Sequence, residues 1–160
     1  MKLRELLRIL ADHGVRFAVV GGVALIARGG QRTTEDLDVA YARDRDNLKH
    51  LADALAPIHP RLRGVPSDLP FVFDDVTLRN GLNFTLDTDL GPIDLLGEVA
   101  GLGGFDQVDA ASSELEIAGA RMLVLTLDGL ERAKRAAGRP KDLFDLGTIR
   151  ALKAEESPRS

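Results

Sequence analysis

The feature that most constrains this chain is the stretch from Val19 to Tyr41. An apolar run ends at Gly21-Gly22, and thirteen residues separate this pair from Asp36-Leu37-Asp38. The run predicts a strand, and the glycines predict a tight exit into a helix. Side chains alternate on a strand, so Asp36 and Asp38 should point to one face, about 7 Å apart at their Cα atoms. Two such carboxylates predict a site for a divalent cation such as Mg²⁺, which takes oxygen ligands.

Composition bounds the kind of protein. The chain has 160 residues, of which 44% are hydrophobic and 29% charged, as expected for one globular domain, over residues 1–154, with a frayed polar tail at 155–160. A net charge of -4 argues against nonspecific nucleic-acid coating, and the absence of cysteine excludes disulfides, thiolate zinc sites and cysteine nucleophiles. Without an apolar run long enough to cross a membrane, we expect a soluble cytoplasmic protein.

Hydrophobic periodicity predicts an α/β chain in which strands and helices are interspersed. A turn at residues 89–91 suggests a hairpin, Gly138 should end one helix, and Pro140 should open the last, which would bury Leu143, Leu146, Ile149 and Leu152. Helices are expected at 2–13, 23–28 and 44–56, before the two closing helices, and strands at 17–20, 36–41, 82–87, 92–99, 114–118 and 122–125.

Taken singly, these motifs are weak. A Gly-Gly pair is most often a tight turn, and an acidic residue on a strand is most often a solvated edge position. Other phosphate motifs are absent, since the chain has neither a P-loop nor a dinucleotide fingerprint. The serines lack a nucleophile-elbow context, and the three histidines are scattered over predicted helix ends and loops, so they read as surface or capping residues.

Order and spacing are more specific than any single motif. Gly21, Gly22, Asp36 and Asp38 match the signature of the polymerase-β-type nucleotidyltransferase superfamily, which the chain therefore resembles. The third acidic residue of that signature falls on Asp94, in the apolar sequence Gly-Pro-Ile-Asp-Leu-Leu. The segment before the acidic pair, Arg32-Thr33-Thr34, is similar to the polar approach to the pair in that family.

The C-terminal part resembles a narrower group, the AbiEii-like nucleotidyltransferases of the abortive-infection toxins. Residues 130–136, and then Arg-Pro-Lys-Asp-Leu-Phe-Asp-Leu at 139–146, look like their lysine helix and final acidic motif. The resemblance points to Lys134 and Asp142 as active-site residues. The plainer reading is that Lys134 is solvated and that Asp142 stabilises the dipole of a helix at its first turn. Because five cations fall between residues 132 and 141, we also expect an anionic partner.

The resemblance implies a nucleotidyltransferase fold, with a small mixed central sheet flanked by helices and C-terminal helices completing the cleft. It implies transfer of a nucleoside monophosphate from an NTP, with Mg²⁺, or Mn²⁺ in its place, on Asp36, Asp38 and Asp94. Asp94 would complete a second cation site or act as the base, and these roles stay open. The catalytic set would include Lys134 and Asp142, and the NTP would contact Gly21, Gly22, Arg32, Thr33 and Lys134.

The resemblance leaves the acceptor and the partners open. The acceptor could be tRNA or other RNA, a protein, or a small molecule such as a lincosamide or aminoglycoside antibiotic. A cognate antitoxin or toxin partner, in a phage-defence context, and a homodimer that completes the cleft are both expectations of this reading. The alternative is a noncatalytic nucleotide-binding or toxin–antitoxin module of the same fold, although the presence of all three carboxylates favours the enzyme.

Overall fold

The computed structural model describes residues 1–66 and 68–156. Its centre is a seven-stranded mixed sheet in the order β3-β4-β5-β2-β1-β7-β6, as the α/β prediction requires. The strands are β1 (Phe17–Val20), β2 (Leu37–Tyr41), β3 (Arg61–Leu62), β4 (Asn83–Thr88), β5 (Gly91–Leu96), β6 (Ser112–Ile117) and β7 (Ala120–Leu125). The helices are α1 (Leu3–Asp12), α2 (Gly21–Ala27), α3 (Arg45–Leu55), the 3-10 turn η1 (Ala56–Ile58), α4 (Asp75–Asn80), α5 (Phe105–Ala110), α6 (Leu127–Ala137) and α7 (Pro140–Glu156).

The register of the central strands places the acidic residues side by side. β2 pairs antiparallel with β1 and parallel with β5, and Asp38 lies directly opposite Asp94. Because side chains alternate along a strand, the flanking residues point to the other face. That face is closed, since the side chains of Leu37, Val39, Ile93 and Leu95 are all fully buried. The two aspartates remain on a face that is only partly covered.

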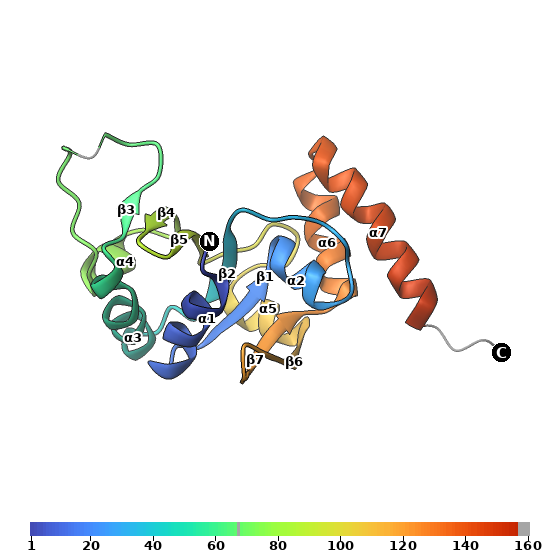
Figure 1. The fold of residues 1–160 in the computed structure, drawn as a ribbon, viewed down its shortest axis with the longest axis horizontal. Helices are drawn as coiled ribbons and strands as arrows, with labels where there is room; N and C mark the ends of the chain where they lie inside the picture. The colour runs from blue at the N-terminus through green and yellow to red at the C-terminus, as the bar shows by residue number, and fades with distance from the viewer. Residues whose placement is uncertain (67, 157–160) are drawn as a thin grey trace.

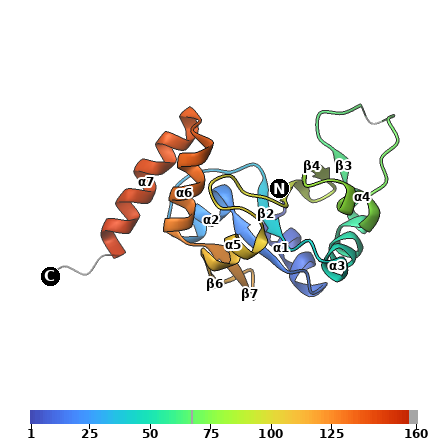
Figure 2. The ribbon, with the colours of Figure 1, turned by 180° about the vertical axis from the view of Figure 1, so that it is seen from behind.

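The molecule is elongated, with the sheet between two helical ends. α6 and α7 lie at one end, and β3, α3 and α4 lie at the other, in both views (Figures 1 and 2). The first turn of α2 begins directly at the end of β1, next to β2 (Figure 1). α2 also contacts α6, so the C-terminal helices adjoin the centre of the sheet.

The C-terminal helices follow local signals. Thr126 caps α6 by accepting a hydrogen bond from the Gly129 N–H, and Gly138 ends α6 in the left-handed region at φ 63°. Pro140 then begins α7, as predicted. The prediction that Leu143 is buried is wrong, because its side chain is 65% exposed. At 100° per residue, the inward face of α7 follows Asp142, Asp145, Leu146 and Ile149 instead.

Most predicted elements are confirmed with shifted ends, including the hairpin of β4 and β5. Gly21 and Gly22 form the first turn of α2 rather than a turn preceding it, and Asp36 stands just before β2. β3, α4 and α5 were not predicted, because β3 has only two residues and the two helices have fewer than two turns each, too short to show a period. α7 continues to Glu156, two residues into the predicted tail, and the rest of that tail lies outside the described residues.

Among the described residues, no helix is both long and apolar enough to cross a membrane.

Candidate active site

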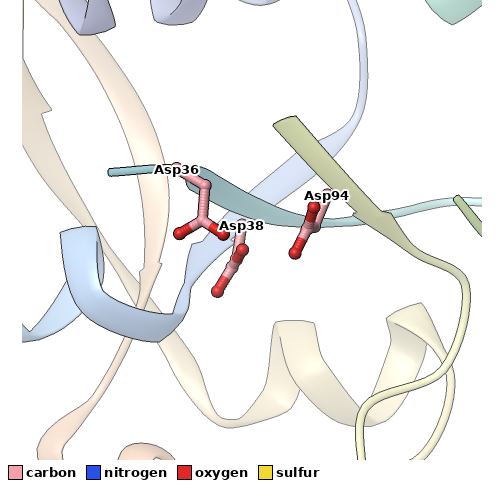
Figure 3. Close-up of side chains that lie close together, drawn as sticks. All are labelled: Asp36, Asp38 and Asp94. Carbon is pink, nitrogen blue, oxygen red and sulfur yellow. The ribbon is translucent and has the colours of Figure 1, made fainter. Parts of the chain in front are cut away.

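Three carboxylates converge at the centre of the sheet. Asp36 precedes β2, Asp38 lies within it, and Asp94 lies on the neighbouring β5, so that their side chains hang from the same face (Figure 3). One oxygen of each lies within 4.8 Å of the others. The predicted convergence of the acidic pair with Asp94 is therefore present in the structure.

The cluster holds more negative charge than the described residues around it compensate. Burial of Asp38, together with the nearby charges of Asp36 and Asp94, raises the pKa of its carboxyl from 3.8 to about 7. Its Oδ1 atom is buried and accepts no hydrogen bond from any described residue. A buried acceptor without a donor is costly, and a cation held among the three oxygens would supply the missing partner. The donor set and the orphaned oxygen both fit Mg²⁺ or Mn²⁺.

Gly21 is required for the close approach of α2 to this cluster. Its φ of +66° lies in the left-handed region, and a Cβ atom placed on it would come within 2.2 Å of Asp38 Oδ2. At Gly22, a Cβ atom would lie 3.1 Å from Thr34 Oγ1 and 3.5 Å from Arg32 Cζ. The glycine pair therefore brings the helix backbone against the carboxylates and the 32–34 segment, where only small residues fit.

A second charged cluster joins α6 to α7. Lys134 is 8% exposed, and its Nζ lies 3.2 Å from Asp142 Oδ1 and 2.9 Å from Asp145 Oδ2. Burial disfavours the charge of Asp142, but hydrogen bonds from Arg139 and Lys134 outweigh it and lower the pKa of this carboxyl to about 2. The reading of Lys134 as a solvated side chain is wrong, because the lysine is held between two buried carboxylates.

The polar segment before β2 divides into two parts. Arg32 reaches the second cluster, where its Nη1 lies 2.6 Å from Asp145 Oδ2. Thr33 is exposed, and its carbonyl oxygen accepts a 3.3 Å hydrogen bond from Arg32 Nε. Thr34, by contrast, donates to the Asp36 carbonyl and lies against Gly22. The structure thus brings Arg32, but not the Thr33 side chain, into the charged network.

The five cations between residues 132 and 141 are less available than their density suggests. Lys134 and Arg139 pair with Asp142, and Arg135 pairs with Glu131 on the same helix. Arg132 donates to the Gly101 carbonyl oxygen at 3.4 Å. The segment is therefore partly neutralised by the protein itself.

A cleft of about 280 Å³ lies between the two clusters, and both Asp38 and Lys134 line it. Its remaining walls come mainly from apolar residues at the C-terminal ends of β1, β5 and β7, from the 98–100 loop and from α6. The lining residues are Val20, Gly21, Asp38, Asn83, Leu96, Glu98, Val99, Ala100, Leu125, Leu130, Ala133, Lys134, Ala137 and Arg139. A ligand in this cleft would contact Asp38 of the first cluster and Lys134 of the second.

Two residues at the site were not predicted. Arg63, one position beyond β3, lies 3.0 Å from Asp94 Oδ1 through its Nη2 atom and 3.9 Å from Asp36 Oδ2 through Nη1. Asp145 joins Lys134 to Arg32. The final acidic motif contained the signal for Asp145, whereas no local pattern marks Arg63. The histidines lie on the surface, and none lies in the cleft.

Sequence comparison does not place this chain in a family. No protein-family model matches it, and no curated protein matches it significantly. At the level of structure, several solved chains match.

The structural matches share one kind of fold. A lincosamide antibiotic adenylyltransferase, LnuA, solved with lincomycin bound, matches with a TM-score of 0.62 at 14% identity, over 94% of this chain and 96% of that one. ANT(2")-Ia, solved with adenylyl-2"-tobramycin, matches with a TM-score of 0.57 at 16% identity, over 96% of this chain and 93% of that one. An antigenic nucleotidyltransferase-like protein from Paracoccidioides brasiliensis matches at 0.55 and 18% identity, over 98% of this chain and 76% of that one. The chain thus has the nucleotidyltransferase fold, as predicted.

Proposed function

We propose that this protein is a Mg²⁺-dependent nucleotidyltransferase that moves a nucleoside monophosphate from an NTP to an acceptor hydroxyl. The observation that carries the proposal is the carboxylate cluster, whose oxygens lie within 4.8 Å of one another beside the first turn of α2. The nucleotidyltransferase fold supports it as well, because the fold is a property of the backbone and does not depend on the three carboxylates.

The reaction joins the acceptor oxygen to the α-phosphorus of the NTP and breaks the bond from that phosphorus to the bridging oxygen, so pyrophosphate leaves. Asp36 and Asp38 would hold Mg²⁺, which when bound neutralises charge on the phosphates. Asp94, across the strand register from Asp38, would take the proton of the acceptor hydroxyl. These residues thus place a base and a cation site on one face of the sheet.

The opposite wall of the cleft would bind the triphosphate. Lys134 faces the cleft and is aimed by Asp142 and Asp145, so its ammonium is a fixed positive charge. Arg32, held by Asp145 beside Gly22, would contribute a second positive charge, with Thr33 next to it at the surface. In this assignment Asp142 is a positioning residue, because it is fully buried behind the lysine.

We further propose that the acceptor is a small molecule. The cleft volume of about 280 Å³ is near the lower end of the range for small-molecule sites, and its walls are mainly apolar. Two structural neighbours were solved with an antibiotic or its adenylylated product. RNA, tRNA and protein acceptors, and a toxin–antitoxin setting with a cognate partner, are competing outcomes of the test. So is a noncatalytic nucleotide-binding module.

The test is label transfer. The purified protein is incubated with Mg²⁺ and each of four α-³²P-labelled NTPs, with aminoglycosides or lincosamides, total RNA and lysate protein offered as separate acceptors. We expect label in the small-molecule pool from one NTP, together with pyrophosphate release. EDTA should abolish both.

The matched control is Asp36→Asn/Asp38→Asn, which keeps the shape of the side chains and removes their charge. Label in RNA or protein would retain the enzyme and replace the acceptor. Failure of transfer from every NTP, with a folded protein that still binds nucleotide, would instead favour the noncatalytic module.

A further inference from the structure

Arg63 is a cation that the protein itself supplies to the carboxylate cluster. Its Nη2 atom lies 3.0 Å from Asp94 Oδ1 and its Nη1 atom 3.9 Å from Asp36 Oδ2. Its guanidinium therefore contacts two of the three carboxylates. Among the described residues, Asp38 has no such ion pair.

The position of Arg63 is fixed independently of these two carboxylates. Its backbone N–H donates to the Thr85 carbonyl at 2.9 Å, extending the pairing of β3 with β4 by one residue. Its Nη2 donates to the Leu86 carbonyl at 2.7 Å, and its Nε donates to Asp87 Oδ1 at 3.1 Å. β4 is the strand next to β5, which carries Asp94. The guanidinium thus remains beside Asp94 even if its contact with that residue is loosened.

The contact with Asp94 is electrostatic rather than a well-formed hydrogen bond. Asp94 Oδ1 is buried and accepts no aligned hydrogen bond from any described residue, although the Arg63 nitrogen lies at ion-pair distance. The Arg63 side chain is 29% exposed and that of Asp94 23%, so water screens the pair only partly. A permanent positive charge at this distance opposes a second divalent ion on the same carboxylate.

We propose that the Arg63 guanidinium takes the place of a second divalent cation at Asp94, so that the cluster binds a single cation, on Asp36 and Asp38. This rests on the proposed function, because it concerns the same cation site. It also resolves the role of Asp94, which is left to act as the base rather than as a ligand of a second cation. Arg63 is then a positioning residue that sets how many cations the site takes.

The test counts bound cations and needs no turnover. Mn²⁺ is titrated into the full chain without nucleotide at pH 8, and free Mn²⁺ is followed by its electron paramagnetic resonance signal. We expect one Mn²⁺ per chain for the unaltered protein. Arg63→Gln should take up a second Mn²⁺, with the first bound about tenfold more tightly, because a nearby positive charge has been removed. Arg63→Lys, which keeps the charge, should stay at one.

The matched control is Arg61→Gln, which removes the same charge two residues away. Arg61 is exposed and pairs with Asp89 instead, so its variant should behave like the unaltered protein. Two Mn²⁺ per chain in the unaltered protein would overturn the proposal, and so would identical stoichiometry and affinity in Arg63→Gln. If Arg63→Gln does not fold, Arg63→Met, which also removes the charge, takes its place, and two Mn²⁺ in the unaltered protein would still overturn the proposal.

A further variant separates this inference from the function beneath it. Asp36→Asn/Asp38→Asn should lose the Mn²⁺ of the unaltered protein. If the double variant retains that Mn²⁺, the cation site of the proposed function is wrong, whatever Arg63 does. If the Mn²⁺ is lost but Arg63→Gln changes nothing, the function stands and only the role of Arg63 fails.

Discussion

The protein contains two charged clusters that face the same cleft and differ in how far their carboxylates are matched by cations. Around Lys134, two buried carboxylates are matched by a lysine and two arginines, and the pKa of Asp142 is lowered to about 2. Around Asp38, three carboxylates share one peripheral arginine, and the pKa of Asp38 is raised to about 7. The charges of the first cluster are matched within the protein, whereas under the proposed function a bound cation would match those of the second. Such a difference is typical of a positioning network that lies beside a ligand-binding site.

The same substitution at the two clusters should give opposite results. Asp38→Asn removes a repelled charge, so we expect unchanged or slightly higher stability, while nucleotidyl transfer falls about 10³-fold through loss of a cation ligand. Steady-state rates and urea unfolding measure the two effects separately. If Asp38→Asn lowered stability and activity together, the cluster would be structural.

Asp142→Asn should mainly lower stability. The Asp142 side chain is fully buried and accepts hydrogen bonds from the Arg139 backbone and side chain and from Lys134. Loss of its charge leaves these cations underpaired, at a cost of about 3 kcal/mol in the free energy of unfolding. Urea unfolding measures this loss, and Lys141→Met, on an exposed residue of the same helix turn, is the control. A stability equal to that of the control would show that the second cluster does not hold α6 and α7 together.

Gly21→Ala tests the steric link between α2 and the carboxylates. The added Cβ would meet Asp38 Oδ2 at 2.2 Å, in a backbone at φ +66° that disfavours alanine. We expect a loss of about 2 kcal/mol in stability and weaker Mn²⁺ binding, because Asp38 must move.

The control is Gly14→Ala, since Gly14 has a φ of +69° and no atom within 4 Å of the added Cβ. It carries the backbone strain without the clash. Equal Mn²⁺ binding by the two variants would remove the proposed role of Gly21.

The two clusters should also respond to pH in different ranges. The raised pKa of Asp38 means that its contribution to stability is fully present below pH 3.8 and is lost as pH rises through about 7. The lowered pKa of Asp142 acts in the opposite sense, because its contribution is present above pH 3.8 and is lost as pH falls through about 2. When the free energy of unfolding is measured against pH, its fall between pH 3.8 and about 7 should be absent in Asp38→Asn. Its fall between pH 3.8 and about 2 should be absent in Asp142→Asn.

Cation binding provides an independent check of the raised pKa of Asp38. Because the cation binds ionised Asp38, Mn²⁺ affinity should rise with pH up to about 7, with proton release that calorimetry in two buffers can measure. An affinity independent of pH between 5 and 8 would contradict the raised pKa.

The Asp-x-Asp spacing was enough to predict Asp36 and Asp38 on one face, whereas Asp94 was added through the family resemblance and its place between isoleucine and leucine. Lys134 and Asp142 came from resemblance, but their mutual burial depends on the angle between α6 and α7, which no local pattern encodes. The prediction that Leu143 is buried was wrong because the predicted residues are spaced by three, which is less than the 3.6 residues of a helical turn. Successive positions in such a series therefore move around the helix and leave its buried face.

The place of Arg63 beside the carboxylates could not be predicted from the sequence. It lies in a proline-rich segment, next to a strand of only two residues, and acquires its role through pairing with β4 more than twenty residues away. Such long-range pairing leaves no periodic signal. Counting charges along the chain also overestimated the free cations of α6, since the carboxylates that neutralise Lys134 come from the next helix.

The most direct measurement is a crystal structure of the protein with Mn²⁺ and a nonhydrolysable NTP analogue, using anomalous scattering to locate the metal. The proposed function predicts an anomalous peak bonded to Asp36 and Asp38, with the triphosphate between the first turn of α2 and Lys134. A triphosphate bound away from the carboxylates, or no Mn²⁺ peak at Asp38 while the nucleotide is in place, would contradict it.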